Sequence, residues 1–184
     1  MPRKGMETVR RAALIDAAIG AIAEDGSGAV TVAKIARRAG VSAPLAHHYF
    51  GSKDAILLAA MRHILRALGS ETAAALRSAE TPLGRVHAIV HASFSPTSFR
   101  PEIVAAWLDF YVAARTDPAV ARLLRVYQGR LRSNLTHALR PLSDEAPRLA
   151  EGTAALIDGV WLRAALGEGG QPATLVTRWI EAQL

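Results

Sequence analysis

Residues 31–53 carry the stretch TVAKIARRAGVSAPLAHHYFGSK, from which the fold of this chain can be predicted. Thr31 can cap a first helix, because its hydroxyl accepts a hydrogen bond from a backbone N–H that lacks a partner at the helix start. Apolar residues then follow on one helix face, at i, i+3, i+4 and i+7: Val32, Ile35, Ala36 and Ala39. Gly40 can adopt the positive φ of a tight turn, and Ser42 can cap a second helix. Two short helices joined in this way form a helix-turn-helix, whose second helix enters the major groove of DNA.

The second of these helices has one side suited to a core and one suited to solvent. Ala46, Tyr49 and Phe50 are expected on the buried side. The side chains expected to face outward are Ala43, Pro44, Leu45, His47 and His48. This outward set has few long hydrogen-bonding side chains. Base readout is therefore expected from His47, from the Ser42 hydroxyl and from apolar contact with thymine methyl groups.

Phosphate contacts are expected from basic residues around the turn. Lys34, Arg37 and Lys53 are placed to contact phosphates, which position a protein on DNA without reading its sequence. Arg38 fits a phosphate contact and a solvated helix surface equally well. The complete set of DNA-binding candidates is Thr31, Lys34, Arg37, Ser42, Ala43, Pro44, His47, His48 and Lys53. The alternative is a helical hairpin that only packs against a core.

The order Val41-Ser42, His48-Tyr49-Phe50 and Ser52-Lys53 resembles the pattern of the TetR family of repressors. Pro44 departs from this pattern, because the family usually has glycine there. Proline is tolerated in the first turn of a helix, where its missing N–H would have no partner, although it removes one backbone donor for a phosphate. The resemblance implies an N-terminal three-helix DNA-binding domain, followed by a helical domain for effector binding and dimerisation.

The composition agrees with a DNA-binding protein of one or two small domains. The chain has 184 residues, 51% of them hydrophobic, which is enough for a sizeable core. Its formal net charge is +6, and residues 1–62 carry nine Lys or Arg against five Asp or Glu, which suits a DNA-facing end. The chain has no cysteine, so disulfides and thiolate metal sites are excluded and a cytoplasmic location is expected. No stretch is apolar for long enough to span a bilayer.

Proline, glycine and capping residues divide the chain into helices, and no alternating strand pattern is found. A loose basic arm is expected at residues 1–6, with helices at about 7–25, 31–39, 42–50 and 52–68. Further helices are expected at about 82–94, 101–115, 118–140, 147–166 and from 172 to near the C-terminus. The predicted fold is all-α. Its expected parts are a DNA-binding domain at 1–53, a connecting helix at 54–68 and an effector-binding and dimerisation domain at 69–184.

The second prominent stretch is residues 154–166, which are mostly apolar. Ala155 and Gly159 lie four residues apart, and small residues on one face let another helix approach closely. Together with the last helix, this face could form a four-helix seam across a two-fold axis. The expected interface residues are Ala155, Leu156, Gly159, Val160, Arg163, Leu175 and Trp179. The alternative is a core helix within one chain; a homodimer is favoured because a DNA reader of this type binds two half-sites.

A closer resemblance, over nearly the whole chain, is to the BetI-type repressors within the TetR family. It is carried by residues 1–6, 10–11, 14–17, 35–42, 106–108, 133–135 and 155–166, the last of which is ALIDGVWLRAAL. Repressors of this type control glycine betaine synthesis from choline. The resemblance implies that the protein leaves DNA, or represses differently, when choline is present.

Choline is a quaternary ammonium ion, which is best held by aromatic faces together with a carboxylate. Trp107, Phe110 and Tyr111 follow at i, i+3 and i+4, on one face of one helix. Further effector-binding candidates are Phe94, Phe99, Trp161 and, as the counter-charge, Asp158. Asp109 ranks lower, because it lies on the opposite side of the helix from Trp107. An aromatic stripe of this kind is also typical of a protein core, and Trp161 could belong to the dimer seam instead.

No catalytic or cofactor-binding motif is found in the sequence. His87 and His91 are spaced four residues apart, as in some zinc sites, but no third ligand is evident. Neither a phosphate-binding loop nor a G-x-S-x-G sequence occurs. We therefore expect a protein that is not an enzyme and uses no metal or cofactor. The alternatives are a TetR-family repressor of another small cationic or lipophilic compound, and a helical enzyme or protein-binding module.

Overall fold

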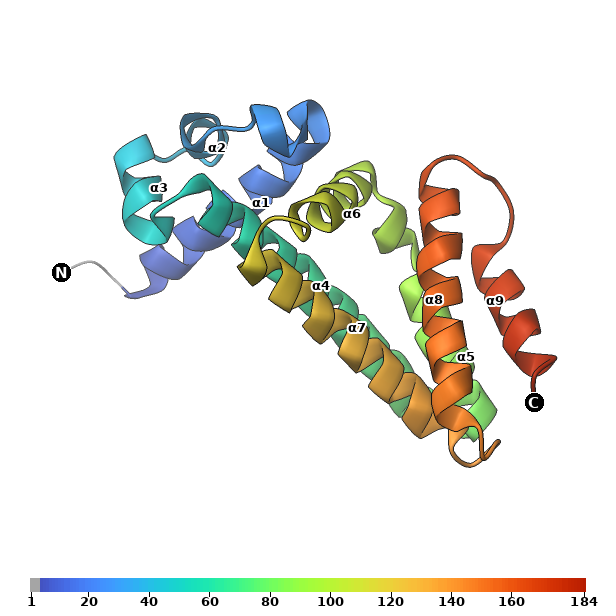
Figure 1. Cartoon of the computed structure of the whole chain (residues 1–184). Helices are drawn as coiled ribbons and strands as arrows, with labels where there is room; N and C mark the ends of the chain where they lie inside the picture. Colours follow the sequence, from blue (N-terminus) through green and yellow to red (C-terminus); the bar gives the residue numbers. More distant parts are fainter. Residues whose placement is uncertain (1–3) are drawn as a thin grey trace. The chain divides into compact units, whose positions relative to one another are not determined.

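The computed structural model describes residues 4–184, which form helices and no strands. The α-helices of the first half are α1 (Lys4–Ala29), α2 (Val32–Arg38), α3 (Ala43–Phe50), α4 (Lys53–Ser78) and α5 (Pro82–Ser93) (Figure 1). A short 3-10 helix, η1 (Pro96–Phe99), comes next. It is followed by α6 (Pro101–Ala113), α7 (Pro118–Leu139), α8 (Ala146–Ala165) and α9 (Pro172–Glu181). The prediction of an all-α fold is confirmed. None of the described helices has the length and apolar character needed to cross a membrane.

The chain forms two compact units. The first contains the residues up to 65 together with 100–122, and the second contains 66–99 together with 123–184. Helices α4 and α7 therefore each contribute to both units. Helix α6 belongs to the first unit, although the sequence placed its segment in the effector-binding part.

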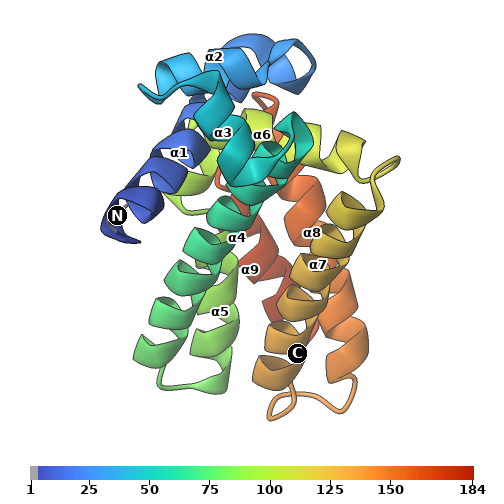
Figure 2. The same cartoon turned by 90° about the vertical axis from the view of Figure 1, so that its left-hand side faces the viewer.

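In the first unit, α1 packs along α6 and also contacts α2, which in turn packs against α3 (Figure 2). The core of this unit contains fully buried side chains from several helices, among them Leu14, Ala18, Ile35, Ala46 and Ile56. Ala46 is the fully buried residue of α3, whereas Pro44, His47 and His48 of the same helix are exposed.

The helix-turn-helix is fixed by the local hydrogen bonds that the sequence predicts. The hydroxyl of Thr31 accepts from the N–H of Lys34 at 3.2 Å, and the hydroxyl of Ser42 accepts from the N–H of Leu45 at 3.4 Å. Gly40 turns with φ 67°. Ser52 caps α4 in the same way, accepting from the N–H of Ala55 at 3.1 Å. The predicted caps are confirmed, because each depends on residues within three positions of one another.

In the second unit, α9 packs against both α8 and α5. Its core contains Val86, Leu135, Leu139, Ile157 and Ile180, each at most 2% exposed. The predicted break at Thr81-Pro82 is confirmed, since the Thr81 hydroxyl accepts from the N–H of Gly84 at 3.0 Å.

Several expected boundaries and exposures are wrong. Helix α1 already includes residues 4–6, where a loose arm was expected; residues 1–3 lie outside the described residues. It also extends past the expected end to Ala29, with a kink at Gly26 (φ 72°, ψ 154°). Helix α4 continues through Gly69 to Ser78. Tyr49 and Phe50, expected to be buried, are only half-buried, and so are Ala43 and Leu45, which were expected to face outward.

Candidate nucleic-acid interface and effector site

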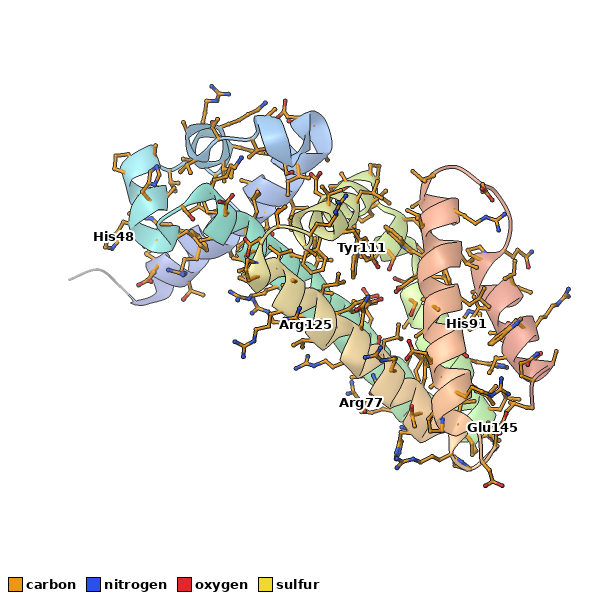
Figure 3. All side chains as sticks on the ribbon, viewed as in Figure 1. His48, Arg77, His91, Tyr111, Arg125 and Glu145 are labelled. Atoms are coloured by element: carbon orange, nitrogen blue, oxygen red, sulfur yellow. The ribbon has the colours of Figure 1, made fainter. Side chains whose placement is uncertain are left out.

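The surface of the reader helix α3 is open. Ser42, Pro44, His47 and His48 are exposed, and so are Thr31 and Arg37 on the neighbouring segment. Pro44 stands in the first turn of α3, where it costs no helical hydrogen bond. His48 projects outward from α3 (Figure 3). The remaining DNA-binding candidates, Lys34, Ala43 and Lys53, are half-buried.

The orientation of the His47 ring is set by the end of its own helix. Its Nδ1 lies 3.1 Å from the carbonyl oxygen of Gly51, the residue that caps α3 with φ 80°. A carbonyl oxygen only accepts, so Nδ1 carries the proton. The neutral ring is then left with Nε2 as an acceptor. In a major groove, such an acceptor matches the exocyclic amino groups of adenine and cytosine.

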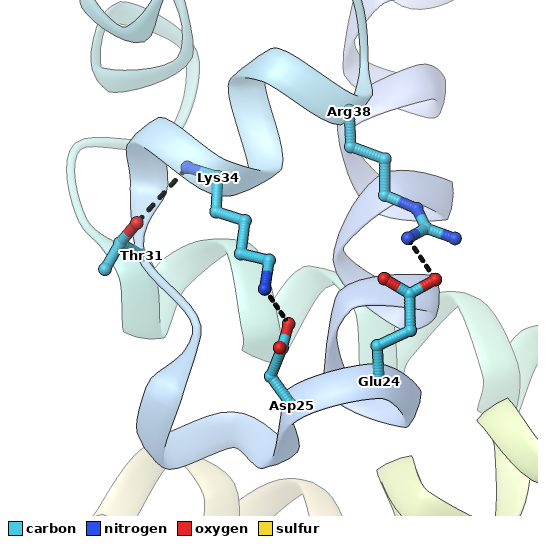
Figure 4. A network of polar contacts seen from close by, with 5 residues as sticks. All are labelled: Glu24, Asp25, Thr31, Lys34 and Arg38. Atoms are coloured by element: carbon cyan, nitrogen blue, oxygen red, sulfur yellow. Dashed lines mark hydrogen bonds and ion pairs between the residues drawn. The ribbon is translucent and has the colours of Figure 1, made fainter.

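Two basic residues of α2 are paired with carboxylates of α1 (Figure 4). The Lys34 ammonium forms an ion pair with Asp25, and Nη1 of Arg38 lies 2.6 Å from Oε1 of Glu24. The Arg38 guanidinium also covers Gly20, where an added Cβ would come within 2.5 Å of it. Arg37 is exposed, and its side chain has no hydrogen bond or ion pair to any residue that the structure describes. Of the three basic residues of α2, Arg37 is therefore the one that a phosphate can reach without competition.

Lys53 contacts the kinked end of α1 within the same unit. Its ammonium donates to the carbonyl oxygen of Ser27 at 3.3 Å. The N–H of Ser27 in turn donates to Oδ2 of Asp109 on α6, at 2.9 Å. The turn that follows Gly26 is therefore held from two sides, by the first residue of α4 and by the middle of α6.

Arg11 of α1 holds the last turn of α3. Its guanidinium lies 4.6 Å from the ring centroid of Phe50 and 5.9 Å from that of Tyr49. Its Nη1 donates to the carbonyl oxygen of Tyr49 at 2.8 Å. Arg11 thus covers two half-buried rings and holds the last turn of α3 against α1.

The aromatic effector candidates form two clusters, one in each unit. On α6, the Trp107 ring lies 5.8 Å from Phe110 and 5.7 Å from Tyr111, measured between centroids. In the second unit, Phe99 stacks between Phe94 and Trp161, with centroid distances of 6.4 Å on each side. Asp158 also belongs to the second unit and is half-buried. Trp107, Phe110, Phe94 and Trp161 are each at most 9% exposed.

The residue that the sequence ranked low, Asp109, lines a cavity in the first unit. The cavity has a volume of about 240 Å³ and is bordered by α1, α4, α6 and the start of α7. Asp109 shares this lining with Asp54, Asp117 and the ring of Phe110, whereas Trp107 and Tyr111 are not part of it. As predicted, Asp109 lies on a different face of α6 from Trp107. No sequence signal showed that this face borders a cavity, because the walls contributed by α1 and α4 come from residues more than forty positions away.

The dimer candidates are accessible on the second unit. Ala155, Gly159, Arg163 and Leu175 are exposed, and Leu156, Val160 and Trp179 are half-buried. Leu162, Leu166 and Leu175 are 40%, 67% and 51% exposed, an unusual display of large apolar side chains within a short stretch of chain. An added Cβ at Gly159 would meet no atom of the chain within 4 Å.

His87, one of the two histidines with the spacing of some zinc sites, contacts a carboxylate. Its Nε2 lies 2.8 Å from Oε1 of Glu181, so α5 and α9 are joined by a polar contact within the second unit. Within the described part of the chain, no three His, Cys, Asp or Glu side chains come together in a way that could hold a metal ion.

A capped helix-turn-helix with an exposed reader helix defines a DNA-binding transcriptional regulator, and comparison with known proteins identifies the family. Residues 14–60 match the model of the bacterial regulatory proteins of the tetR family. Residues 82–184 match the model of the C-terminal part of BetI-type transcriptional repressors. The chain belongs to the TetR family and is of the BetI type, a group of transcriptional regulators and not of enzymes.

Relatives in sequence and in structure agree with this assignment. An HTH-type transcriptional regulator BetI from Brucella melitensis biotype 2 is 51% identical, over 100% of this chain and 96% of that protein. Another, from Rhizobium meliloti, is 52% identical over 90% of this chain and 83% of that protein. A transcriptional regulator from Pseudomonas aeruginosa PAO1 has a similar structure, with a TM-score of 0.82 and 28% identity over 94% of this chain and 86% of that one. The structure of a regulator from Saccharomonospora viridis in complex with choline has a TM-score of 0.81 and 23% identity, over 94% of this chain and 93% of that one.

Proposed function

We propose that this protein is a choline-responsive repressor, which binds a palindromic operator as a homodimer and controls the genes that convert choline to glycine betaine. The observation that carries this proposal is 51% identity, over the entire chain, to a curated BetI regulator. The choline complex of the regulator from Saccharomonospora viridis lends further support, because that protein has the same fold. A second candidate effector is another small cationic or lipophilic compound, acting on a repressor of the same kind.

The geometry of the reader supports DNA binding through a small set of side chains. Ser42 and His47 are exposed on α3 and can reach base edges, while Pro44 and Ala43 offer apolar contact to thymine methyl groups. Arg37 and Lys53 supply positive charge for phosphates, and Lys34 does so if it leaves Asp25. One such helix reads only a few base pairs, so operator affinity requires a second copy about 34–36 Å away, or a multiple of that distance.

The exposed leucines of the second unit support a dimer through α8 and α9. Ala155 and Gly159 leave room for a close helix approach, and Leu175 supplies an apolar contact that is uncovered in one chain. Burial of Leu175 between two copies would remove its apolar surface from water.

The decisive experiment is fluorescence anisotropy with a labelled DNA fragment from upstream of the gene that encodes this chain. Protein is titrated first, and choline is then added to the complex. Tight binding that choline weakens or alters is expected. If binding is tight but unaffected by choline, the DNA-binding function stands and the effector is a different compound. If DNA is not bound, the whole proposal is wrong.

Lys53→Ala tests the assignment of phosphate contacts in the same assay. We expect weaker binding to operator and to unrelated DNA by similar factors, because phosphates carry no sequence information. Arg85→Ala, a basic residue of the second unit, is the control and should leave both affinities unchanged. A loss at the operator alone would contradict the role of Lys53.

A further inference from the structure

We propose that the cavity of the first unit is the binding site for the small organic cation, with Asp109 as its counter-charge, and that Asp109 links this site to the DNA reader. This inference rests on the proposed function for the identity of the cation. It moves the counter-charge from Asp158, in the second unit, to α6.

The cavity is small and its walls are mainly apolar. Its volume of about 240 Å³ lies below the roughly 300–1,000 Å³ of sites for drug-sized ligands, so its occupant is a smaller molecule. Leu57, Met61 and Val120 provide apolar walls, and Phe110 provides an aromatic one. Methyl groups of a quaternary ammonium suit such walls, and an aromatic ring attracts their positive charge.

The charged side chains that line the cavity are all carboxylates. Asp54, Asp109 and Asp117 are among its fourteen lining residues, and no Lys, Arg or His is. The lining therefore favours a cation over an anion or a fatty acid. Two of these carboxylates already have local tasks: Asp117 caps α7, accepting from the N–H of Ala119 at 2.7 Å, and Asp54 stands in the first turn of α4. Asp109 lies in the middle of α6, where its charge caps neither end of the helix.

Asp109 also holds the end of α1. Its Oδ2 accepts from the N–H of Ser27, two residues beyond Asp25, which pairs with Lys34 on α2. A cation that draws this carboxylate toward the centre of the cavity pulls Oδ2 away from the Ser27 N–H, because one side chain makes both contacts. The cation thereby loosens the turn after Gly26 and changes how Asp25 supports α2. Such coupling requires only that the cation binds more tightly to the arrangement in which the turn is released.

Choline binding to the full-length dimer, measured by calorimetry, tests the location of the counter-charge. Asp109→Asn keeps an oxygen that can accept from Ser27 but removes the charge. We expect the Kd for choline to rise at least tenfold in this variant, and by less than twofold in Asp158→Asn. If Asp158→Asn weakens choline binding and Asp109→Asn does not, the proposal is overturned.

A second measurement does not depend on choline, and so separates this proposal from the choline response. The chain has no cysteine, so a single one can be introduced by Ala113→Cys at the cavity wall. Its thiolate attacks a methanethiosulfonate reagent, forming a disulfide as methanesulfinate leaves. We compare the rates with a trimethylammonium reagent and with a sulfonate reagent. The control is Val112→Cys, the adjacent residue, which is 69% exposed and does not line the cavity.

The ratio of the rate with the cationic reagent to the rate with the sulfonate reagent should be at least tenfold higher at position 113 than at position 112. Adding Asp109→Asn should reduce this preference several-fold at 113 and leave it unchanged at 112. If the wild type binds no choline but the Ala113→Cys and Val112→Cys variants show this pattern, the choline response is wrong and the cation site stands. Equal preferences at both positions, or no effect of Asp109→Asn, would overturn the site itself.

Discussion

Arg11→Ala should destabilise the reader helix, and the contacts of Arg11 allow the size of the effect to be worked out. Its guanidinium faces the rings of Phe50 and Tyr49, and a cation–π contact at a partly exposed site contributes about 0.5–1 kcal/mol. Its charged hydrogen bond to the Tyr49 carbonyl adds about 1.5–3 kcal/mol, at the lower end here because the side chain is 41% exposed. The ion pair to Glu7, at 3.6 Å, adds only about 0.3–0.5 kcal/mol.

We therefore expect Arg11→Ala to lower the free energy of unfolding by about 2 kcal/mol. The assay is urea unfolding followed by circular dichroism, at one fixed protein concentration because a dimer's stability depends on it. With an m-value of about 2 kcal/mol/M, the midpoint should fall by roughly 1 M. Arg11→Lys should recover less than half of the loss, because an ammonium lacks the planar guanidinium that stacks on rings.

The neighbouring Arg10 provides the matched control. Its side chain makes no hydrogen bond or ion pair with any residue that the structure describes, so Arg10→Ala should change stability by less than about 0.5 kcal/mol. If the two variants lose the same stability, the guanidinium contacts to α3 do not contribute as reasoned.

Three further predictions concern a turn, an interface and a base contact. Gly26→Ala should lower the free energy of unfolding in urea by about 1–3 kcal/mol, because a φ of 72° with a ψ of 154° is accessible almost only to glycine. Gly28→Ala should lower it far less, and equal losses would contradict the expected backbone strain at position 26. Leu175→Glu should convert the proposed dimer to monomers in analytical ultracentrifugation, whereas Val112→Glu, at an exposed position of the first unit, should not; a Leu175→Glu dimer would exclude this interface. His47→Ala should weaken operator binding by about 1–3 kcal/mol. Replacing the contacted adenine of the operator by purine, which lacks the amino group, should weaken binding of the wild type but not of the variant. A variant whose binding remains sensitive at every adenine and cytosine would contradict this contact.

Local chemistry made much of the fold predictable from the sequence. The caps at Thr31, Ser42 and Ser52 involve atoms within three residues, so residue type and spacing were enough. The end of α4 was not predictable in this way. Gly69 looked like a stop, but a glycine inside a helix costs only about 1 kcal/mol, which other contacts of a 26-residue helix can offset.

The parts of the site that escaped prediction depend on contacts between distant residues. Asp109 and Ser27 are separated by 82 positions, so no helical period could reveal their bond. Likewise, Lys34 was assigned to phosphate from its charge alone, and its pairing with Asp25 depends on how α1 ends after the kink. The aromatic stripe on α6 was correctly placed on one helix, but its three rings divide between a cavity wall and other surroundings.

The ion pairs of α2 also affect how strongly the DNA affinity of this protein depends on salt concentration. Each phosphate that a protein neutralises releases about 0.9 of a bound counterion, and this release makes affinity fall steeply with ionic strength. To contact a phosphate, Lys34 or Arg38 must first leave its carboxylate, and the freed Asp25 or Glu24 would then attract cations of its own. Their net contribution to counterion release is accordingly small. The operator complex should therefore tolerate rising salt better than the number of basic residues on its DNA-facing surface would suggest.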